Sequence, residues 1–267
     1  MLKDITLGQF FPGNTIVHRL DPRTKLILVI VYIVTLFSAK WFLTYGLVLA
    51  ALVGVILASK IQIKTIVKSL KPLLFIIVLP GILNLFYTQG EVLVKIWFLT
   101  ITKEGVFSAI FMVLRIAMLI AGTFMLTYTT SPIALTDGLE LLLNPLKKIK
   151  VPVHELAMMM CIALRFIPTL IEETDKIMSA QKARGADFET GSLLSRAKAL
   201  IPILVPLFIS SFRRADELAV AMECRCYHGG EGRTRMKQLR YAARDIVALC
   251  GGFVIMVIVI VLGHFGL

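Results

Sequence analysis

Two long segments of mixed character dominate the pattern of apolar and polar residues in this chain. They run from about residue 154 to 185 and from about residue 193 to 227, with apolar residues at the three- and four-residue spacing of helices. Each segment is apolar in its first half and rich in charges in its second half. At 1.5 Å per residue, each helix would be about 45 to 50 Å long. The pattern predicts rods that begin against a membrane and end on a soluble partner.

Prolines lie in the apolar halves of both predicted rods. Pro168 lies in the first, and Pro202 and Pro206 lie in the second, where each removes a backbone hydrogen bond and bends the helix. The uninterrupted apolar runs are about 13 to 16 residues long, shorter than the roughly 20 residues that cross a bilayer. The sequence therefore favours long kinked amphipathic helices that lie along or across the cytoplasmic face. Two ordinary transmembrane helices with proline kinks are the alternative.

Apolar segments outside the rods predict about five transmembrane helices, at residues 26–37, 41–58, 72–87, 106–128 and 246–262. Because 57% of the 267 residues are hydrophobic, the composition indicates an all-α integral membrane protein. The predicted domains are a membrane domain of four spans at 1–129, a cytoplasmic coupling domain with both rods at 130–245, and a C-terminal transmembrane helix at 246–267. The opening residues 1–9 lack the continuous apolar run of a signal peptide.

The distribution of basic residues predicts the orientation in the membrane. With the N-terminus in the cytoplasm, residues 1–25, 59–71 and 130–245 lie inside, and Lys40, Lys95 and Lys103 lie outside. The opposite orientation violates the positive-inside rule, so the C-terminus is predicted to be external. The net charge of +12 lies next to the spans, so insertion and anionic lipid explain it and no nucleic-acid partner is expected. The last span follows a basic run of Arg233, Arg235, Lys237, Arg240 and Arg244.

Motifs for catalysis, metal binding and nucleotide binding are weak in the sequence. The cluster Cys224-x-Cys226-x-His228 does not have a standard zinc spacing and lacks an evident fourth ligand. The sequence contains no Gly-x-x-x-x-Gly-Lys-Ser/Thr, so the chain is not expected to use ATP through a Walker site. The four cysteines are scattered and predict no disulfide framework, which suits a reducing cytoplasmic side. We expect a non-catalytic protein without a metal or cofactor of its own.

Two features lie within the predicted spans. Small residues at every fourth position of the second span form a stripe that lets another helix approach closely, either from the same chain or from another membrane subunit. Arg115 lies near the middle of the fourth span, where a charge is costly. Because the spans offer it no acidic partner, it is either a functional residue or a structural one that bonds backbone carbonyls or faces a wet crevice. The stripe consists of Gly46, Ala50, Gly54 and Ala58.

Each rod ends in an arginine among small residues. The triplets are Ala183-Arg184-Gly185 and Cys224-Arg225-Cys226. An arginine in such surroundings can enter a groove and donate several hydrogen bonds to carboxylates or carbonyls. It can also simply interact with the dipole at the helix C-terminus. Two such ends, on rods of similar length, favour docking on a partner with two similar surfaces, such as a nucleotide-binding dimer.

The sequence resembles the transmembrane (T) component of energy-coupling factor transporters, ATP-driven importers of vitamins and other micronutrients in prokaryotes. The resemblance covers nearly the whole chain and is most specific at residues 164–185 and 206–227. It includes His18-Arg19-Leu20-Asp21-Pro22-Arg23-Thr24-Lys25 and Thr129-Thr130-Ser131-Pro132. In that family, Ala-Arg-Gly-like motifs at the ends of two coupling helices insert into grooves of two ATPase subunits. The matching triplets here are those at Arg184 and Arg225, the second with cysteines where Ala and Gly are usual.

The resemblance implies a scaffold in the cell membrane with three partners. Two are related ATPase subunits, which bind ATP and Mg²⁺, and the third is a substrate-binding membrane subunit, the S component, which carries the choice of micronutrient. Two alternatives stay open. One is the permease subunit of a conventional ABC importer, which binds substrate itself. The other is a self-contained carrier or membrane enzyme, against which the lack of an internal repeat and of acidic residues in the spans weighs.

Overall fold

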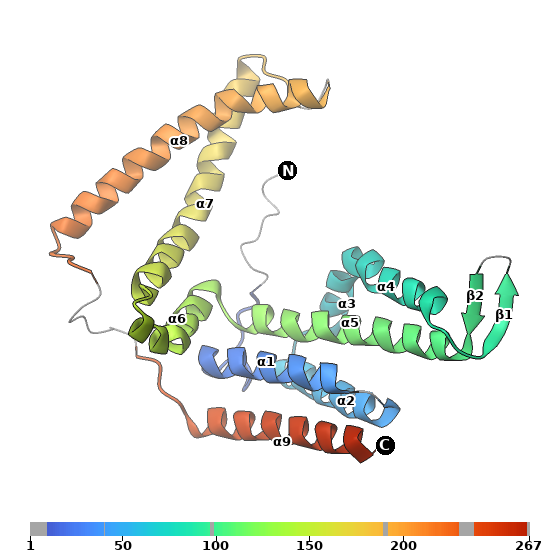
Figure 1. The fold of residues 1–267 in the computed structure, drawn as a ribbon. Coiled ribbons are helices and arrows are strands. Elements are labelled where there is room, and N and C mark those ends of the chain that lie inside the picture. Colours follow the sequence, from blue (N-terminus) through green and yellow to red (C-terminus); the bar gives the residue numbers. More distant parts are fainter. Residues whose placement is uncertain (1–9, 40, 97–98, 189–191, 230–237, 266–267) are drawn as a thin grey trace. The chain divides into compact units, whose positions relative to one another are not determined.

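The computed structural model describes residues 10–39, 41–96, 99–188, 192–229 and 238–265 (Figure 1). The chain folds into two compact units, each treated by itself. Gly8–Leu139 and Leu239–Leu267 form one, named the bundle unit here, and Glu140–Gln238 contribute to the other, named the rod unit. Lys40 and the basic residues at positions 233, 235 and 237, which enter the topology prediction, lie outside the described residues.

The bundle unit is built from apolar helices that run side by side (Figure 1). The long helix α5 contacts α1, α2, α3 and α4, and α9 packs against α1 and α2. Chain segments from both ends of the sequence thus share one bundle. The elements are α1 (Pro22–Ser38), α2 (Phe42–Ser59), α3 (Ile63–Leu70), the 3-10 turn η2 (Lys71–Leu73), α4 (Leu74–Tyr87), β1 (Val92–Ile96), β2 (Leu99–Thr102), α5 (Lys103–Thr129) and α9 (Ala243–Phe265).

The rod unit contains the two long helices that the sequence predicts, α7 (Val153–Ala183) and α8 (Leu193–Glu223). Each has 31 residues and is therefore about 46 Å long. Both continue as helices through their internal prolines. They contact each other, and Arg214 of α8 forms an ion pair of 2.6 Å with Glu173 of α7. α6 (Pro132–Leu143) and the 3-10 turn η3 (Asn144–Ile149) precede them in the chain.

Within the described residues, five helical segments are long and apolar enough to cross a membrane: Phe42–Ser59, Ile63–Tyr87, Lys103–Thr129, Val153–Ala183 and Ala243–Phe265. The prediction of an all-helical integral membrane protein is confirmed, although the segments are not the same five. Helix α1, which contains the first expected span, has only 17 residues. Helix α7 qualifies instead, because its apolar half stays apolar on average although Arg165 and Thr169 interrupt it.

Residues 88–105, expected only as a connection outside the membrane, contain the strands β1 and β2. These strands pair in antiparallel register, with Ile96 opposite Leu99 and Val92 opposite Thr102. The ribbon closes at its base, where the hydroxyl of Thr102 caps α5 by accepting the N–H of Gly105 at 3.1 Å and donates to the Thr88 carbonyl at 2.8 Å. This short ribbon is an addition to the helical fold and does not change its class.

The core of the bundle unit lies between α1, α2 and α5. Tyr45, Val48 and Tyr128 are almost fully buried there, and the Tyr45 ring stacks on Phe111 with centroids 5.0 Å apart. The outer faces of the bundle helices are apolar and exposed, as at Phe42 of α2 (72% exposed) and Phe75 of α4 (73%). Such surface has no favourable contact in water, whereas a bilayer covers it without cost. The protein is therefore a multi-pass membrane protein.

Arg115 forms hydrogen bonds inside the bundle unit. Its Nε donates to the Tyr45 hydroxyl at 2.7 Å, and one terminal nitrogen donates to the Ala39 carbonyl at 3.2 Å. The guanidinium also lies 5.7 Å from the ring centroids of Phe37 and Tyr45. Bonding to a carbonyl was one of the structural roles the sequence left open. The charge ties α5 to the end of α1 and the start of α2.

Candidate functional site

The arginine at the end of α7 lies in a closed helix-terminating turn. The N–H of Gly185 donates to the Lys182 carbonyl at 2.9 Å, and the N–H of Ala186 donates to the Gln181 carbonyl at 3.0 Å. These two bonds are the pair that defines a Schellman motif. Gly185 has φ +87°, a left-handed conformation that glycine adopts without strain. Arg184 is the last residue before that glycine, so the turn fixes its backbone.

The end of α8 has the same hydrogen-bond pattern around Arg225. The N–H of Cys226 donates to the Glu223 carbonyl at 2.8 Å, and the N–H of Tyr227 donates to the Met222 carbonyl at 3.0 Å. Cys226 stands where Gly185 stands in the first turn, and its φ is +56°. A side chain in this conformation costs roughly 1–2 kcal/mol. The departure from Ala-Arg-Gly thus adds backbone strain to the turn but leaves its hydrogen-bond geometry unchanged.

The two arginines are therefore equivalent in local structure. In both turns the arginine N–H donates to the carbonyl three residues earlier, at 3.1 Å in each case. Arg184 and Arg225 are exposed, and neither takes part in an ion pair within the described part of the chain. Their helix ends lie well apart in the rod unit (Figure 1). Docking on two similar surfaces requires two similar guanidinium groups that lie apart and form no ion pair within the chain. The two arginines meet this requirement in the described residues. Docking itself stays a prediction.

The small-residue stripe of α2 is exposed, and its Gly54 and Ala58 lie at an apolar cavity between α1, α2, α5 and α9. Gly46, Ala50, Gly54 and Ala58 are all exposed, whereas Val48, Leu52 and Ile56 of the same helix are buried. A β-carbon added at Gly46 or Gly54 would meet no atom within 4 Å. Of the two uses that the sequence allows for the stripe, packing inside this chain is not the arrangement found. Packing of another membrane subunit stays a prediction.

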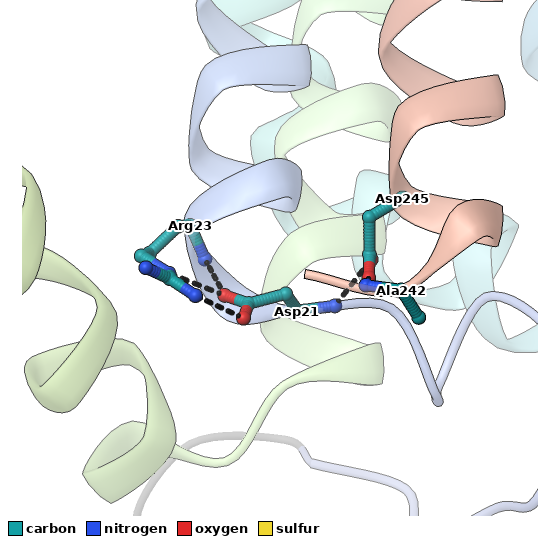
Figure 2. Close-up of polar contacts among 4 residues, drawn as sticks. All are labelled: Asp21, Arg23, Ala242 and Asp245. Carbon is teal, nitrogen blue, oxygen red and sulfur yellow. Dashed lines mark hydrogen bonds and ion pairs between the residues drawn. The ribbon is translucent and has the colours of Figure 1, made fainter. Parts of the chain in front are cut away.

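A polar junction joins the start of α1 to the start of α9 within the bundle unit (Figure 2). The Asp245 carboxylate accepts the N–H of Asp21 and the N–H of Ala242, both at 2.8 Å. The Asp21 carboxylate in turn accepts the Arg23 guanidinium at 2.8 and 3.0 Å and caps α1 through the Arg23 N–H at 2.9 Å. Burial alone would raise the pKa of Asp21, but the hydrogen bonds from Arg23 outweigh it and hold that pKa below its usual value.

A lysine extends this junction to the end of α5. Lys25 Nζ donates to the Thr129 carbonyl at 2.8 Å, to the Thr130 hydroxyl at 3.1 Å and to the His18 carbonyl at 3.3 Å. Two stretches that carry the family resemblance, His18–Lys25 and Thr129–Pro132, thus meet. The sequence assigned them no role. Their resemblance to the family was the one available signal, and Asp245 carried no signal.

The Cys224-x-Cys226-x-His228 cluster does not form a set of metal ligands in the described residues. No group of three or more His, Cys, Asp or Glu side chains comes together among them. Just after the end of α8, His228 Nδ1 forms a hydrogen bond of 2.9 Å with the Cys226 carbonyl instead of joining a ligand set. The cysteines at 224 and 226 are free and exposed.

The apolar bundle and the arginine-ended rods define a class: a helical, multi-pass membrane protein whose two long helices end in exposed arginine tips, at Arg184 and Arg225. Comparison with known proteins identifies the family within this class. Residues 13–236 match the family described as "CbiQ: Cobalt transport protein". The chain is similar to proteins named "Energy-coupling factor transporter transmembrane protein EcfT" from Clostridium kluyveri, Thermosediminibacter oceani and Bacillus subtilis. The identities are 57% over 253 residues (94% of each chain), 56% over 247 residues (92% of this chain, 93% of the relative) and 48% over 246 residues (92% and 93%).

The chain belongs to this family of energy-coupling factor transporter transmembrane proteins. It is a membrane component of an energy-coupling factor transporter. The resemblance seen in the sequence is thereby confirmed.

Proposed function

We propose that this chain couples ATP hydrolysis in two partner ATPase subunits to substrate import by a membrane S component. The observation that carries the proposal is the equivalence of the two tips, in which Arg184 and Arg225 occupy the same position of the same turn. ATP and Mg²⁺ are bound by the ATPases, and this chain supplies no catalytic group. In this role the chain is a scaffold that transmits movement.

The rods carry the movement from the ATPases to the membrane. When ATP binding brings the ATPases together, docked tips move with them, and α7 and α8 shift the surface against which the S component lies. A tip can transmit only the difference between its affinities for the two ATPase states. The ion pair between Arg214 and Glu173 supports this role because it links the two rods between their tips and their apolar halves.

Exposed apolar surface supports a membrane partner. Phe208 (59% exposed), Ile209 (58%) and Phe212 (69%) lie on the apolar part of α8. The stripe of α2 offers a second surface on which a helix can approach closely. Placing the N-terminus and the rods in the cytoplasm, with the C-terminus external, puts the tips on the side where ATP is available.

The test is a double charge reversal at the tips, Arg184→Glu with Arg225→Glu. Losing a buried, hydrogen-bonded arginine from an interface costs about 2–5 kcal/mol, so ATP-dependent uptake should fall at least tenfold. The variant should still reach the membrane in normal amount. The matched control is Arg213→Glu, an equal charge reversal at an exposed position of α8 away from the tip, which should leave uptake nearly normal.

Affinity capture from native membrane gives the second readout. The wild-type chain and the Arg213→Glu control should bring down two related ATPases and a small hydrophobic subunit. The double variant should lose the ATPases and keep the hydrophobic subunit. Normal uptake together with normal ATPase capture in the double variant would refute the docking proposal. Capture of a substrate by this chain alone would instead favour the permease of a conventional importer.

A further inference from the structure

The bundle unit contains a cavity of about 630 Å³ between α1, α2, α5 and α9. Its lining is predominantly aliphatic. The space is open because several lining positions carry small residues, among them Gly54 and Ala58 of α2 and Ala248 and Gly251 of α9. Sites for organic ligands have volumes of about 300–1,000 Å³. Apolar cavities of this kind stay dry and take up apolar ligands.

The cavity is elongated along the helices. Its lining runs from Lys25 to Thr35 on α1 and from Arg244 to Ile255 on α9, which is about 15 Å along each helix. A cavity of this length and lining suits an extended hydrocarbon chain.

Positive charge lies at one end of this apolar space. Lys25 and Arg244 both line the cavity at the N-terminal ends of their helices. The acceptors of Lys25 at Thr129, Thr130 and His18 are all uncharged, so its charge is not neutralised by contact with a carboxylate. Arg244 is exposed and forms no ion pair with any described residue.

The acidic residues near this end of the cavity bond to groups other than Lys25 and Arg244. Both oxygens of Asp245 accept backbone N–H groups, and Asp21 pairs with Arg23. These carboxylates reduce the positive potential without contacting either cavity-lining cation through an ion pair in the described residues. An apolar tunnel with an arginine and a lysine at one end is complementary to an anionic amphiphile.

We propose that this cavity binds a phospholipid with an anionic head group, with an acyl chain in the cavity and the phosphate at Arg244, where the charge of Lys25 adds to the positive potential. An arginine guanidinium suits phosphate because it donates two parallel hydrogen bonds. Basic pockets between transmembrane helices are typical sites for anionic lipids. The bound lipid fills the space between α2 and α9 and completes the bundle. The site does not depend on ATPase docking.

The experiment uses the full-length chain captured from native membrane with its partners. Two probes are compared: phosphatidylglycerol with a photoactivatable acyl chain, and phosphatidylcholine with the same chain. After illumination, crosslinks to peptides of α1, α2 and α9 are quantified by mass spectrometry. At about fivefold for each basic residue near an anionic surface, phosphatidylglycerol should exceed phosphatidylcholine by tenfold or more.

Three variants distinguish recognition of the lipid head group from binding of the acyl chain. Arg244→Gln should lower the preference for phosphatidylglycerol about fivefold and keep crosslinking to both lipids. Gly251→Leu and Gly54→Leu each fill the tunnel from one side, since an added β-carbon meets no atom within 4 Å at either position. Both should abolish crosslinking of both lipids at the cavity. Gly46→Leu on the exposed stripe, and Arg240→Gln outside the cavity lining, are the matched controls and should leave crosslinking of both lipids at the cavity unchanged.

Equal labelling by the two lipids in the wild type would overturn the head-group assignment. Unchanged labelling in both leucine variants would overturn the tunnel as the site. Wild-type crosslinks to a partner subunit at these peptides, in place of lipid, would show that the cavity holds protein. If one leucine variant does not fold, the other fills the same tunnel from the opposite helix.

Discussion

Cys226 marks a difference in backbone strain between the two arginine tips. It holds a left-handed backbone with φ +56°, in the position that Gly185 takes at the other tip with φ +87°. The hydrogen bonds around both turns are otherwise the same within about 0.1 Å. The second tip thus keeps the turn that presents its arginine, at a conformational cost that the first tip does not bear.

We predict that Cys226→Gly stabilises the second tip. Glycine relieves the left-handed strain, and at roughly 1–2 kcal/mol the turn should open about five- to thirtyfold less often. Hydrogen exchange at the Tyr227 amide measures this directly, because that N–H closes the turn on the Met222 carbonyl. Gly185→Ala is the reverse experiment, and it should speed exchange at the Ala186 amide. Unchanged exchange in both variants would mean that neither turn is limited by backbone strain.

At the level of helices, glycines divide sharply between close contacts and open surface. A β-carbon at Gly122 of α5 would overlap the ring of Tyr32 on α1. That ring cannot easily move, since its hydroxyl donates to the Met118 carbonyl at 2.8 Å. Gly46 of α2 has open space instead. The first glycine holds the bundle together, whereas the second is free for an incoming helix.

Alanine substitutions should separate these two roles. Gly122→Ala forces α1 and α5 apart and should lower the stability of the purified chain by about 1–3 kcal/mol, seen as a lower midpoint of thermal unfolding in detergent. Gly46→Ala should leave that midpoint unchanged. A bulkier pair, Gly46→Leu with Ala50→Leu, should reduce capture of the hydrophobic subunit without loss of thermal stability. Equal destabilisation by Gly122→Ala and Gly46→Ala would contradict the packing seen in the bundle unit.

Local signals explain which elements could be predicted from the sequence. The ends of α7 and α8 are encoded within a few residues by the arginine triplets and the chain that follows, and the helices end two and four residues before their predicted ends. The polar junction depends on contacts between distant residues. No local pattern indicates that the N–H of Asp21 meets a carboxylate 224 residues later. The direction in which the α2 stripe faces likewise depends on tertiary packing, since periodicity identifies a face but not what covers it.

Span prediction shows the same limit at a larger scale. Counting the apolar run only as far as Glu172 makes α7 too short to cross, whereas an average over 18 residues qualifies it as a span. The opposite holds for α1, which is strongly apolar but has only 17 residues. Charge distribution is less sensitive to such choices. Adding or removing an even number of spans between two basic segments leaves both on the same side.

For the whole molecule, the proposed orientation makes a prediction at the second tip and at the 88–105 connection, with all five sequence-predicted spans counted. With the N-terminus inside, the second tip is cytoplasmic and the 88–105 connection is external. Cys226 is exposed and free, so it can report its own side. In a variant that keeps only this cysteine (Cys161, Cys224 and Cys250→Ser), a membrane-impermeant maleimide should label Cys226 in inside-out vesicles and leave it unlabelled in intact cells.

The matched control is Gln89→Cys in a background without other cysteines, because Gln89 is exposed in the connection between α4 and β1. It should give the opposite pattern, with labelling in intact cells. Since both sites are exposed, a difference between them reports the side of the membrane and not burial. Labelling of Cys226 from outside would place the tips away from ATP and end the coupling proposal. The lipid site would survive that result, because it depends on charge and space within the bundle unit and not on which side the tips occupy.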